Sequence, residues 1–138
     1  MKLTSTIISI VSIFSIALAD QVKYDISYDR GESMLTNVAC SNGVNGLLSK
    51  GFGAYNSLPS FPNIGAAKAV EGWNSTACGS CWNITYKEKW IVVTAIDHAD
   101  DGFNLALKAM DTLTDGHAKE LGVIDAQASQ IDKSHCGL

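Results

Sequence analysis

The chain has 138 residues, with 10 Lys and Arg against 14 Asp and Glu, which gives a formal net charge of −4 when the histidines are neutral. Because no run of Lys or Arg is present to neutralise phosphates, nucleic acid is not an expected partner, and an anionic membrane surface fits poorly. Neutral partners such as sugars fit this composition better. The length suits one small domain, and the chain shows no internal repeat or linker.

The first 19 residues have the composition of a secretory signal peptide. Lys2 is followed by an apolar stretch over residues 7–16, and Ala17-Leu18-Ala19 places small residues where a signal peptidase cleaves. A membrane anchor is the alternative, but the stretch is shorter than the ~20 residues that a span needs. We therefore predict a signal peptide over residues 1–19, a secreted domain over residues 20–138, and no membrane contact after the leader is removed.

The first half of the domain alternates between short ordered elements and loops. Apolar and polar residues alternate over residues 22–28, which predicts a strand with one buried face. Four glycines between positions 43 and 53 predict a loop, with a helical turn around Leu47-Leu48. Two prolines make residues 58–63 an extended or turning loop, because each disfavours helix in the residue before it. A short helix is predicted over residues 65–70.

The second half contains the clearest strands. Residues 81–87 alternate, and residues 90–96 are apolar and β-branched, so we predict a hairpin whose turn is Lys87-Glu88-Lys89. Residues 105–113 have helical spacing, and residues 126–132 predict a last strand that leads to the final cysteine. Several short strands with few helices indicate a small, mostly β barrel.

The four cysteines, at positions 40, 78, 81 and 136, allow three disulfide pairings. Cys78 and Cys81 form a Cys-x-x-Cys motif, which also occurs in redox dithiols and zinc sites. An oxidising compartment favours permanent disulfides, and no second such motif or spaced pair of histidines supports a metal site. We expect two structural disulfides, with the pairing open, and neither a metal site nor a cofactor.

Two Asn-x-Ser/Thr sequons occur in the chain, at Asn74-Ser75-Thr76 and at Asn83-Ile84-Thr85. Each is a candidate for N-glycosylation in a protein that enters the secretory pathway. The motif also occurs by chance, so the sequence does not choose between Asn74 and Asn83.

Short motifs accompany the cysteines in a fixed order: Tyr28-Asp29, Ala39-Cys40-Ser41-Asn42-Gly43, Phe61-Pro62-Asn63-Ile64-Gly65, Gly72-Trp73, Cys78-Gly79-Ser80-Cys81-Trp82, Asp97 and Gly102-Phe103-Asn104. None is specific alone, but the ordered set closely resembles the cerato-platanin family of small secreted fungal proteins. The resemblance implies a six-stranded double-psi β-barrel with short helices, and disulfides Cys40–Cys78 and Cys81–Cys136.

The resemblance also carries expectations about function. It implies an extracellular or wall-associated protein that binds chitin fragments, loosens polysaccharide networks as expansins do without clear hydrolysis, and is sensed by plants as an elicitor. The chain departs from the better-known members after Asp97. They have a serine and a glycine-rich loop there, whereas this chain has His98-Ala99-Asp100-Asp101, which changes the charge beside the expected groove.

Asp97 is the first candidate site residue, because it ends a predicted buried strand and by resemblance matches the groove aspartate of expansins and related endoglucanases. A lone aspartate beside a loop otherwise caps a turn. Glycoside hydrolysis usually needs two carboxylates at a set separation. The spacing of Asp29, Asp100 and Asp101 marks none of them as the partner of Asp97. We therefore predict that Asp97 binds sugar hydroxyls and that the protein has no catalytic residues.

The other candidates come from the same motifs. Tyr28 can stack on a sugar face or close the barrel rim, and Asn104 can both donate to and accept from a hydroxyl or acetamido group. By resemblance, Ser41 and Ser80 lie near the groove. The predicted carbohydrate-binding residues are Tyr28, Asp29, Ser41, Ser80, Asp97 and Asn104.

Aromatic and histidine residues outside this set are expected to be structural. Trp82 and Trp90 fall on apolar strand faces and are predicted to lie in the core, whereas Trp73, in a loop, is left open between a platform and a structural role. His98 is expected to be an exposed loop residue. With His117 and His135 in other contexts, no metal site is predicted.

The sequence thus favours a non-catalytic protein that binds N-acetylglucosamine oligomers or β-glucan, with a host receptor as a further partner. A weak endoglucanase on the same barrel is one alternative. A surface-active, self-assembling coat protein is another, because residues 90–96 have the composition of an aggregation-prone strand. The sequence leaves open whether the protein is a monomer.

Overall fold

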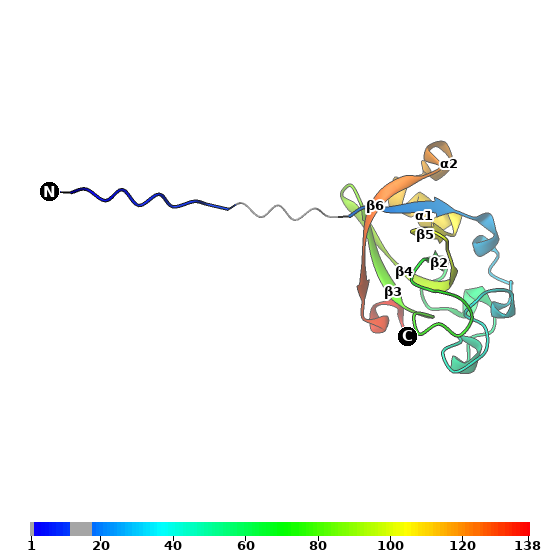
Figure 1. Cartoon of the computed structure of the whole chain (residues 1–138). Coiled ribbons are helices and arrows are strands. Elements are labelled where there is room, and N and C mark those ends of the chain that lie inside the picture. Colours follow the sequence, from blue (N-terminus) through cyan, green and yellow to red (C-terminus); the bar gives the residue numbers. More distant parts are fainter. Residues whose placement is uncertain (1, 12–17) are drawn as a thin grey trace.

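The computed structural model describes residues 2–11 and 18–138 of the chain. Residues 1 and 12–17, which include much of the apolar stretch of the predicted leader, lie outside the described residues. Residues 2–11 contain neither helix nor strand and run away from the folded part (Figure 1). The first strand begins at Asp20. The signal peptide and its cleavage point remain predictions.

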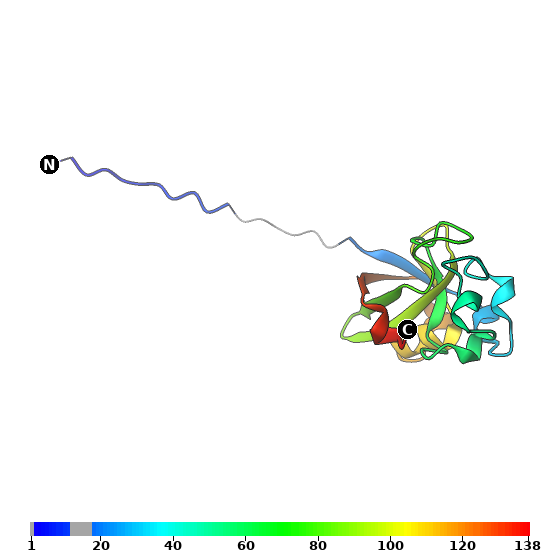
Figure 2. The same ribbon diagram turned by 90° about the horizontal axis from the view of Figure 1, so that it is seen from below.

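The folded part is a closed barrel of six strands, in the order β1-β5-β2-β4-β3-β6 around the barrel (Figures 1 and 2). The strands are β1 (Asp20–Tyr24), β2 (Ile64–Ala67), β3 (Cys81–Tyr86), β4 (Lys89–His98), β5 (Phe103–Leu105) and β6 (Ile124–Ile131). β1 pairs with β5 and β2 with β4 in parallel, and the other neighbours are antiparallel. The predicted fold, a mostly β, six-stranded double-psi barrel, is confirmed.

Two short helices follow β5, α1 (Leu107–Thr114) and α2 (Ala118–Leu121). The helical spacing predicted from position 105 is confirmed from Leu107, since Leu105 still belongs to β5. Asp115, with a left-handed φ of 58°, ends α1. Within the parts of the chain that the structure describes, no helix has the length and apolar character to cross a membrane.

The helix predicted over residues 65–70 is wrong, because strand β2 lies there. All four residues of β2 are buried, and the strand pairs with β4 on one side and with β5 on the other. Gly65 permits this close approach, since a Cβ atom at that position would lie 2.5 Å from the Asn104 carbonyl oxygen. The small side chains of β2 let β4 and β5 approach it closely from both sides, and this strand pairing outweighs the local preference for a helix.

The strand predicted over residues 22–28 ends early, at Tyr24. Asp25 turns the chain, because its Oδ1 accepts a hydrogen bond from the Ser27 amide at 2.8 Å. The backbone amide of Asp25 donates to the Leu105 carbonyl, also at 2.8 Å. Residues Ile26–Asp29 then form a 3-10 turn, so Ile26 is exposed instead of joining the buried face, whereas Tyr28 packs inward.

The predicted hairpin is confirmed, with β3 and β4 paired in antiparallel register from Cys81–Thr94 to Tyr86–Lys89, but its turn is shorter than predicted, because Lys89 already belongs to β4. The prediction that Trp90 lies in the core is wrong: its side chain is on the outer face and is 63% exposed. Strand geometry explains the difference, because the inward positions of β4 near the hairpin are taken by Ile91 and its alternate neighbours. Trp82 is half-buried and packs edge-on against Phe103, with ring centroids 5.3 Å apart.

The disulfides are Cys40–Cys78 and Cys81–Cys136, the pairing that the resemblance implies. They close loops of 38 and 55 positions. By chain-entropy arithmetic each contributes about 4 kcal/mol of stability. The first fastens the long connection between β1 and β2 to the segment before β3, and the second fastens the start of β3 to the end of the chain.

The connection between β1 and β2 covers one side of the barrel, as the cyan to green segment of Figure 1 shows. It contains the helical turn expected near Leu47-Leu48, which spans Leu48–Lys50. The turn expected over residues 58–63 is also present, with a cis peptide between Phe61 and Pro62. The connection carries Tyr28 and Cys40 to the end of β4.

We predict that Gly65→Ala lowers the free energy of unfolding by about 1–3 kcal/mol, because the new methyl group overlaps β5. Gly72→Ala is the matched control, since a Cβ atom there meets no atom within 4 Å. Urea denaturation of both variants checks this. Equal stability of the two variants would contradict the close approach of β2 and β5.

Candidate functional site

Four residues lie in one row across the outer face of the barrel. Lys23 of β1 is opposite Asn104 of β5, which is opposite Ala66 of β2, which is opposite Asp97 of β4. Residues directly opposite one another in paired strands share a face of the sheet. Because neighbouring strands are about 4.8 Å apart, Asn104 and Asp97 are separated by roughly 10 Å. The row presents a cation, an amide and a carboxylate to one side of the barrel.

The Asp97 carboxylate is already bonded within the protein. Its Oδ2 accepts from the Tyr28 hydroxyl at 2.9 Å. Its Oδ1 accepts from the backbone amides of Ala39 at 3.0 Å and His98 at 2.9 Å. A carboxylate has about four acceptor positions, so roughly one, on Oδ2, remains for a ligand. Asp97 therefore caps backbone amides, as a lone aspartate often does, and its Oδ2 can also accept a hydrogen bond from a ligand.

Tyr28 lies beneath this carboxylate, only 6% exposed. Burial, followed by the negative charge of Asp97 and the hydrogen bond to it, raises the pKa of Tyr28 far above its usual range. The ring is also close to Tyr55, at 6.4 Å between centroids. Of the two roles considered for Tyr28, its burial supports closure of the barrel rim, with the hydroxyl orienting Asp97.

Asn104 borders a hollow of about 280 Å³, which is lined by Lys23 and Phe103 of the barrel wall and by residues 98–101. Its side chain is half-buried and makes no hydrogen bond to another group in the described part of the chain. Since no buried side-chain N or O atom among the described residues lacks a partner, the Asn104 amide is open to solvent. It is free to donate to and accept from a ligand.

Asp29, in contrast, is turned away from the row. Its Oδ2 accepts from the Leu107 amide at 2.7 Å and its Oδ1 from the Lys108 amide at 2.9 Å. These N–H groups belong to the first turn of α1 and have no acceptor within the helix, and a negative charge is favourable at this end of a helix. Asp29 thus caps a helix 78 positions further along the chain.

The two serines differ in position. Ser80 is 1% exposed, and its hydroxyl accepts a hydrogen bond from the Trp82 indole at 2.8 Å, which is a structural role rather than a surface one. Ser41 is half-buried and follows Cys40, whose amide donates to the Ile96 carbonyl at 3.1 Å. Ser41 therefore lies near the end of β4.

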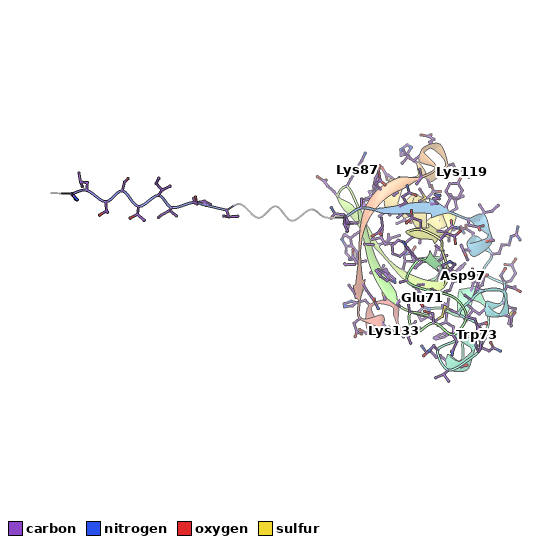
Figure 3. The ribbon with its side chains drawn as sticks, viewed as in Figure 1. Glu71, Trp73, Lys87, Asp97, Lys119 and Lys133 are labelled. Carbon is purple, nitrogen blue, oxygen red and sulfur yellow. A yellow bond between two sulfur atoms is a disulfide. The ribbon has the colours of Figure 1, made fainter. Side chains whose placement is uncertain are left out.

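Trp73 belongs to a separate, braced loop. Its ring is 63% exposed, and its Nε1 donates to Asn42 Oδ1 at 2.7 Å. Next to it, Asn45 donates two hydrogen bonds of 3.0 Å to Asn74. Figure 3 shows Trp73 at the lower end of the molecule, below Asp97. The indole is exposed and yet held in one orientation.

His98 is exposed as expected, but it ends β4 instead of lying in a loop, and its ring contacts the segments that follow β2 and β4. Its Nδ1 is 2.6 Å from the Val70 carbonyl oxygen, to which it donates. Its Nε2 is 3.3 Å from Asp100 Oδ1. The departure from the family pattern at residues 98–101 thus forms one wall of the hollow beside Asn104.

A larger hollow, of about 570 Å³, lies elsewhere, between the β3–β4 turn and the two helices. Figure 3 shows Lys87 of this region at the top of the molecule, away from Asp97. Its charged groups are exposed and pair with one another, as in the 2.7 Å contact between Lys89 and Asp115. We place the site at the row because its polar groups converge on one surface and one of them lacks a protein partner.

The comparison with known proteins decides the family. A model of the Cerato-platanin family matches residues 20–138. The chain belongs to the cerato-platanin family. Allergen Asp f 15 of Aspergillus fumigatus is 47% identical over 120 residues, which cover 87% of this chain and 78% of that protein.

Solved structures agree with this assignment. Cerato-platanin 3 from M. perniciosa has 45% sequence identity and a TM-score of 0.85, covering 88% of this chain and 100% of that one. The solution structure of the fungal elicitor Cerato-Platanin has 32% identity and a TM-score of 0.76, covering 84% and 95%. Proteins of the cerato-platanin family are secreted.

The Tyr28 pKa leads to a prediction for this cerato-platanin at alkaline pH. In the unfolded chain the tyrosine ionises near pH 10.0, whereas the folded protein holds the proton at higher pH. The contribution of protonated Tyr28 to the free energy of unfolding is therefore fully present below pH 10, and it is lost progressively as the pH rises above 10. Between pH 8 and pH 11 this group removes about 1 kcal/mol of unfolding free energy.

Urea denaturation of wild type and Tyr28→Phe at the two pH values tests this. The variant should be less stable at pH 8 by about 1–3 kcal/mol, because Asp97 loses its hydroxyl donor. It should also lose less stability between pH 8 and pH 11 than the wild type does. An identical pH dependence in both proteins would show that Tyr28 ionises normally.

For Asp29 we predict that Asp29→Ala lowers the free energy of unfolding by about 0.5–2 kcal/mol, because two amides of α1 lose their acceptor. Asp125→Ala removes an exposed carboxylate from β6 and should change stability by less than about 0.5 kcal/mol. Thermal denaturation of both variants provides the comparison. If Asp29→Ala is as stable as Asp125→Ala, the helix cap does not stabilise the fold.

Proposed function

We propose that this protein is a secreted, non-catalytic carbohydrate-binding protein, and that its ligands are N-acetylglucosamine oligomers or β-glucan. The observation that carries the proposal is the row of Lys23, Asn104, Ala66 and Asp97, with the Asn104 amide open to solvent beside a hollow. Hydroxyl and acetamido groups need both donors and acceptors, and an amide supplies both. Asp97 adds an acceptor and Lys23 a donor.

The spacing of these groups favours an oligosaccharide over a single sugar. Asn104 and Asp97 are roughly 10 Å apart across β2, where Ala66, the residue between them in the row, is small and buried. A chain of sugars that lies across the strands would contact both residues. Such contacts compete with those between polysaccharide chains, which is the physical basis for expansin-like loosening.

Hydrolysis is not supported by the arrangement of carboxylates. Glycosidases usually place two carboxyl groups on either side of the scissile bond. Asp97 is the acidic member of the row, and Asp29 is turned to the amides of α1. Asp100 is exposed and next to His98. A reducing-sugar assay on chitin oligomers and β-glucan should detect no release.

Recognition by plants is a second part of the proposal. One solved relative, Cerato-Platanin, is a fungal elicitor, and its TM-score of 0.76 indicates the same fold. We propose that this chain likewise acts as an elicitor through a plant receptor. Its secretion and association with the cell wall would place it where both the polysaccharide and the receptor are reached.

Surface activity is the alternative function, and the exposure of Trp73, Trp90 and Val44 favours it. Residues 90–96 have the composition of an aggregation-prone strand, but they give this alternative little support, because β4 is paired with β2 on one side and with β3 on the other. A closed barrel leaves no free edge for a strand of another molecule. Film formation at an air–water interface would support this alternative.

We predict that Asn104→Ala weakens binding of N-acetylglucosamine oligomers up to about tenfold, which corresponds to the loss of one or two neutral hydrogen bonds. Its stability should stay within about 0.5 kcal/mol of wild type, because the amide has no protein partner to lose. Ser129→Ala, on the exposed face of β6, is the control and should bind as wild type.

An NMR titration measures affinity and location together. Shift changes that cluster at Lys23, Asn104 and Asp97 are expected. Unchanged affinity in Asn104→Ala, or shift changes that appear only around Trp73, would move the ligand away from the row. Binding by wild type accompanied by release of sugar would instead favour the weak endoglucanase.

A further inference from the structure

The two sequons lie in very different surroundings. Asn83 is on β3, with its side chain on the outer face of the barrel. Asn74 is in the loop before β3 and has a left-handed φ of 60°. The fold therefore distinguishes two positions that the sequence treats as equal.

The Asn83 sequon is arranged for an outward-pointing glycan. Because side chains alternate along a strand, Asn83 and Thr85 share the outer face. The Thr85 hydroxyl donates to Asn83 Oδ1 at 3.2 Å, which leaves the Nδ2 amide without a hydrogen-bond partner in the described part of the chain. A hollow of about 340 Å³ opens beside both residues, over the neighbouring strand β6.

The neighbours of Asn83 on this face do not obstruct a glycan. Ser129 of β6 and Val92 of β4 are directly opposite Asn83 on its two sides. Both side chains are small. The hollow is otherwise bordered by Gln127 and Ala128, and by Leu18, which belongs to the predicted leader and would leave with it. In the mature chain, the space over Asn83 is therefore open.

The Asn74 side chain is instead part of a loop clamp. Its Oδ1 accepts from the Asn45 amide, and its backbone carbonyl accepts from the Asn45 side chain, both at 3.0 Å. Gly43 is so close that a Cβ atom there would lie 2.6 Å from Asn74 Oδ1. A glycan on Asn74 would have to emerge from between this segment and Trp73, whose ring would lie 3.2 Å from the same Cβ atom.

Trp90 gives a second, independent reason to select Asn83. It is opposite Thr85 in the β3–β4 register, so it is the diagonal neighbour of Asn83 on the same face. Diagonal pairs are about 7–8 Å apart, within reach of large side chains. The indole is 63% exposed on a strand, which is an unusual place for so large an apolar surface. The first sugar of a glycan on Asn83 would lie over this ring.

We propose that Asn83 is the N-glycosylation site of this protein and that the first N-acetylglucosamine of the glycan packs on Trp90. The donor class is a lipid-linked oligosaccharide pyrophosphate of the secretory pathway. The Asn83 amide nitrogen loses one proton and forms a bond to C1 of the sugar. The bond from C1 to the pyrophosphate oxygen breaks, and the lipid pyrophosphate leaves. The proposal depends on secretion but not on sugar binding at the Asn104 row.

The test is expression of the full chain, with its own leader, in a yeast host. The intact mass of the secreted protein is compared before and after treatment with an N-glycosidase. Wild type and Asn74→Gln should both carry one glycan, whereas Asn83→Gln and Thr85→Val should carry none. Thr85→Ser preserves the sequon and should retain the glycan. A glycan that persists in Asn83→Gln, or secreted wild type without any glycan, would overturn the assignment.

A second measurement tests the contact with Trp90. Glycosylated wild type is trimmed with an endoglycosidase that leaves a single N-acetylglucosamine on the asparagine. Compared with Asn83→Gln, the trimmed protein should show about a twofold lower quenching of the Trp90 fluorescence component by acrylamide, with Trp90→Phe used to identify that component. Equal quenching in the two proteins would overturn the packing of the sugar on Trp90.

Discussion

The carboxylate of Asp97 holds together segments that are far apart in the sequence. From the end of β4 it accepts hydrogen bonds from Tyr28 and from the backbone amides of Ala39 and His98. Ala39 precedes Cys40, which is bonded to Cys78. The long connection between β1 and β2 is thus fastened at neighbouring points by a charge-assisted contact and a covalent bond. Because hydrogen bonds to a charged group are stronger than neutral ones, this contact orders a segment that has little regular structure of its own.

This arrangement gives one residue two roles. The resemblance marks Asp97 as a groove aspartate, and the structure makes it an anchor for the loops that border that groove. A substitution that removes the carboxylate therefore disturbs the surface as well as any ligand contact. Asn104 makes no comparable contact among the described residues, so its contribution to binding can be separated from its contribution to the fold.

Local sequence patterns were sufficient to predict the elements whose contacts are to residues nearby in the sequence. The β3–β4 hairpin and α1 follow from alternation and helical spacing, and the disulfide pairing follows from the resemblance. β2 could not be found in this way, because its four residues form a strand only through partners 30–40 positions further along the chain. The same limit applies to Trp90, whose exposure is set by the register of a hairpin whose strands both carry apolar residues.

The candidate site shows the same division. Motifs identified Asp97 and Asn104, but Lys23 and Ala66 join them only through strand register. The motif residue Asp29 serves a helix instead, and Ser80 is buried against Trp82. A match to a family motif marks a residue as a candidate for the site. The match does not show whether the side chain faces solvent or another part of the chain.

The placement of the two disulfides has a consequence for the lifetime of the protein outside the cell. Between Cys40 and Cys136, one break in the backbone leaves both pieces covalently attached, because one or the other disulfide spans the cut. The exception is the short stretch between Cys78 and Cys81, where a cut would release two halves. Gly79 and Ser80, which form this stretch, are both buried. Between Cys40 and Cys136, the one stretch where a single cut would divide the chain is thus inaccessible to a protease while the barrel is intact.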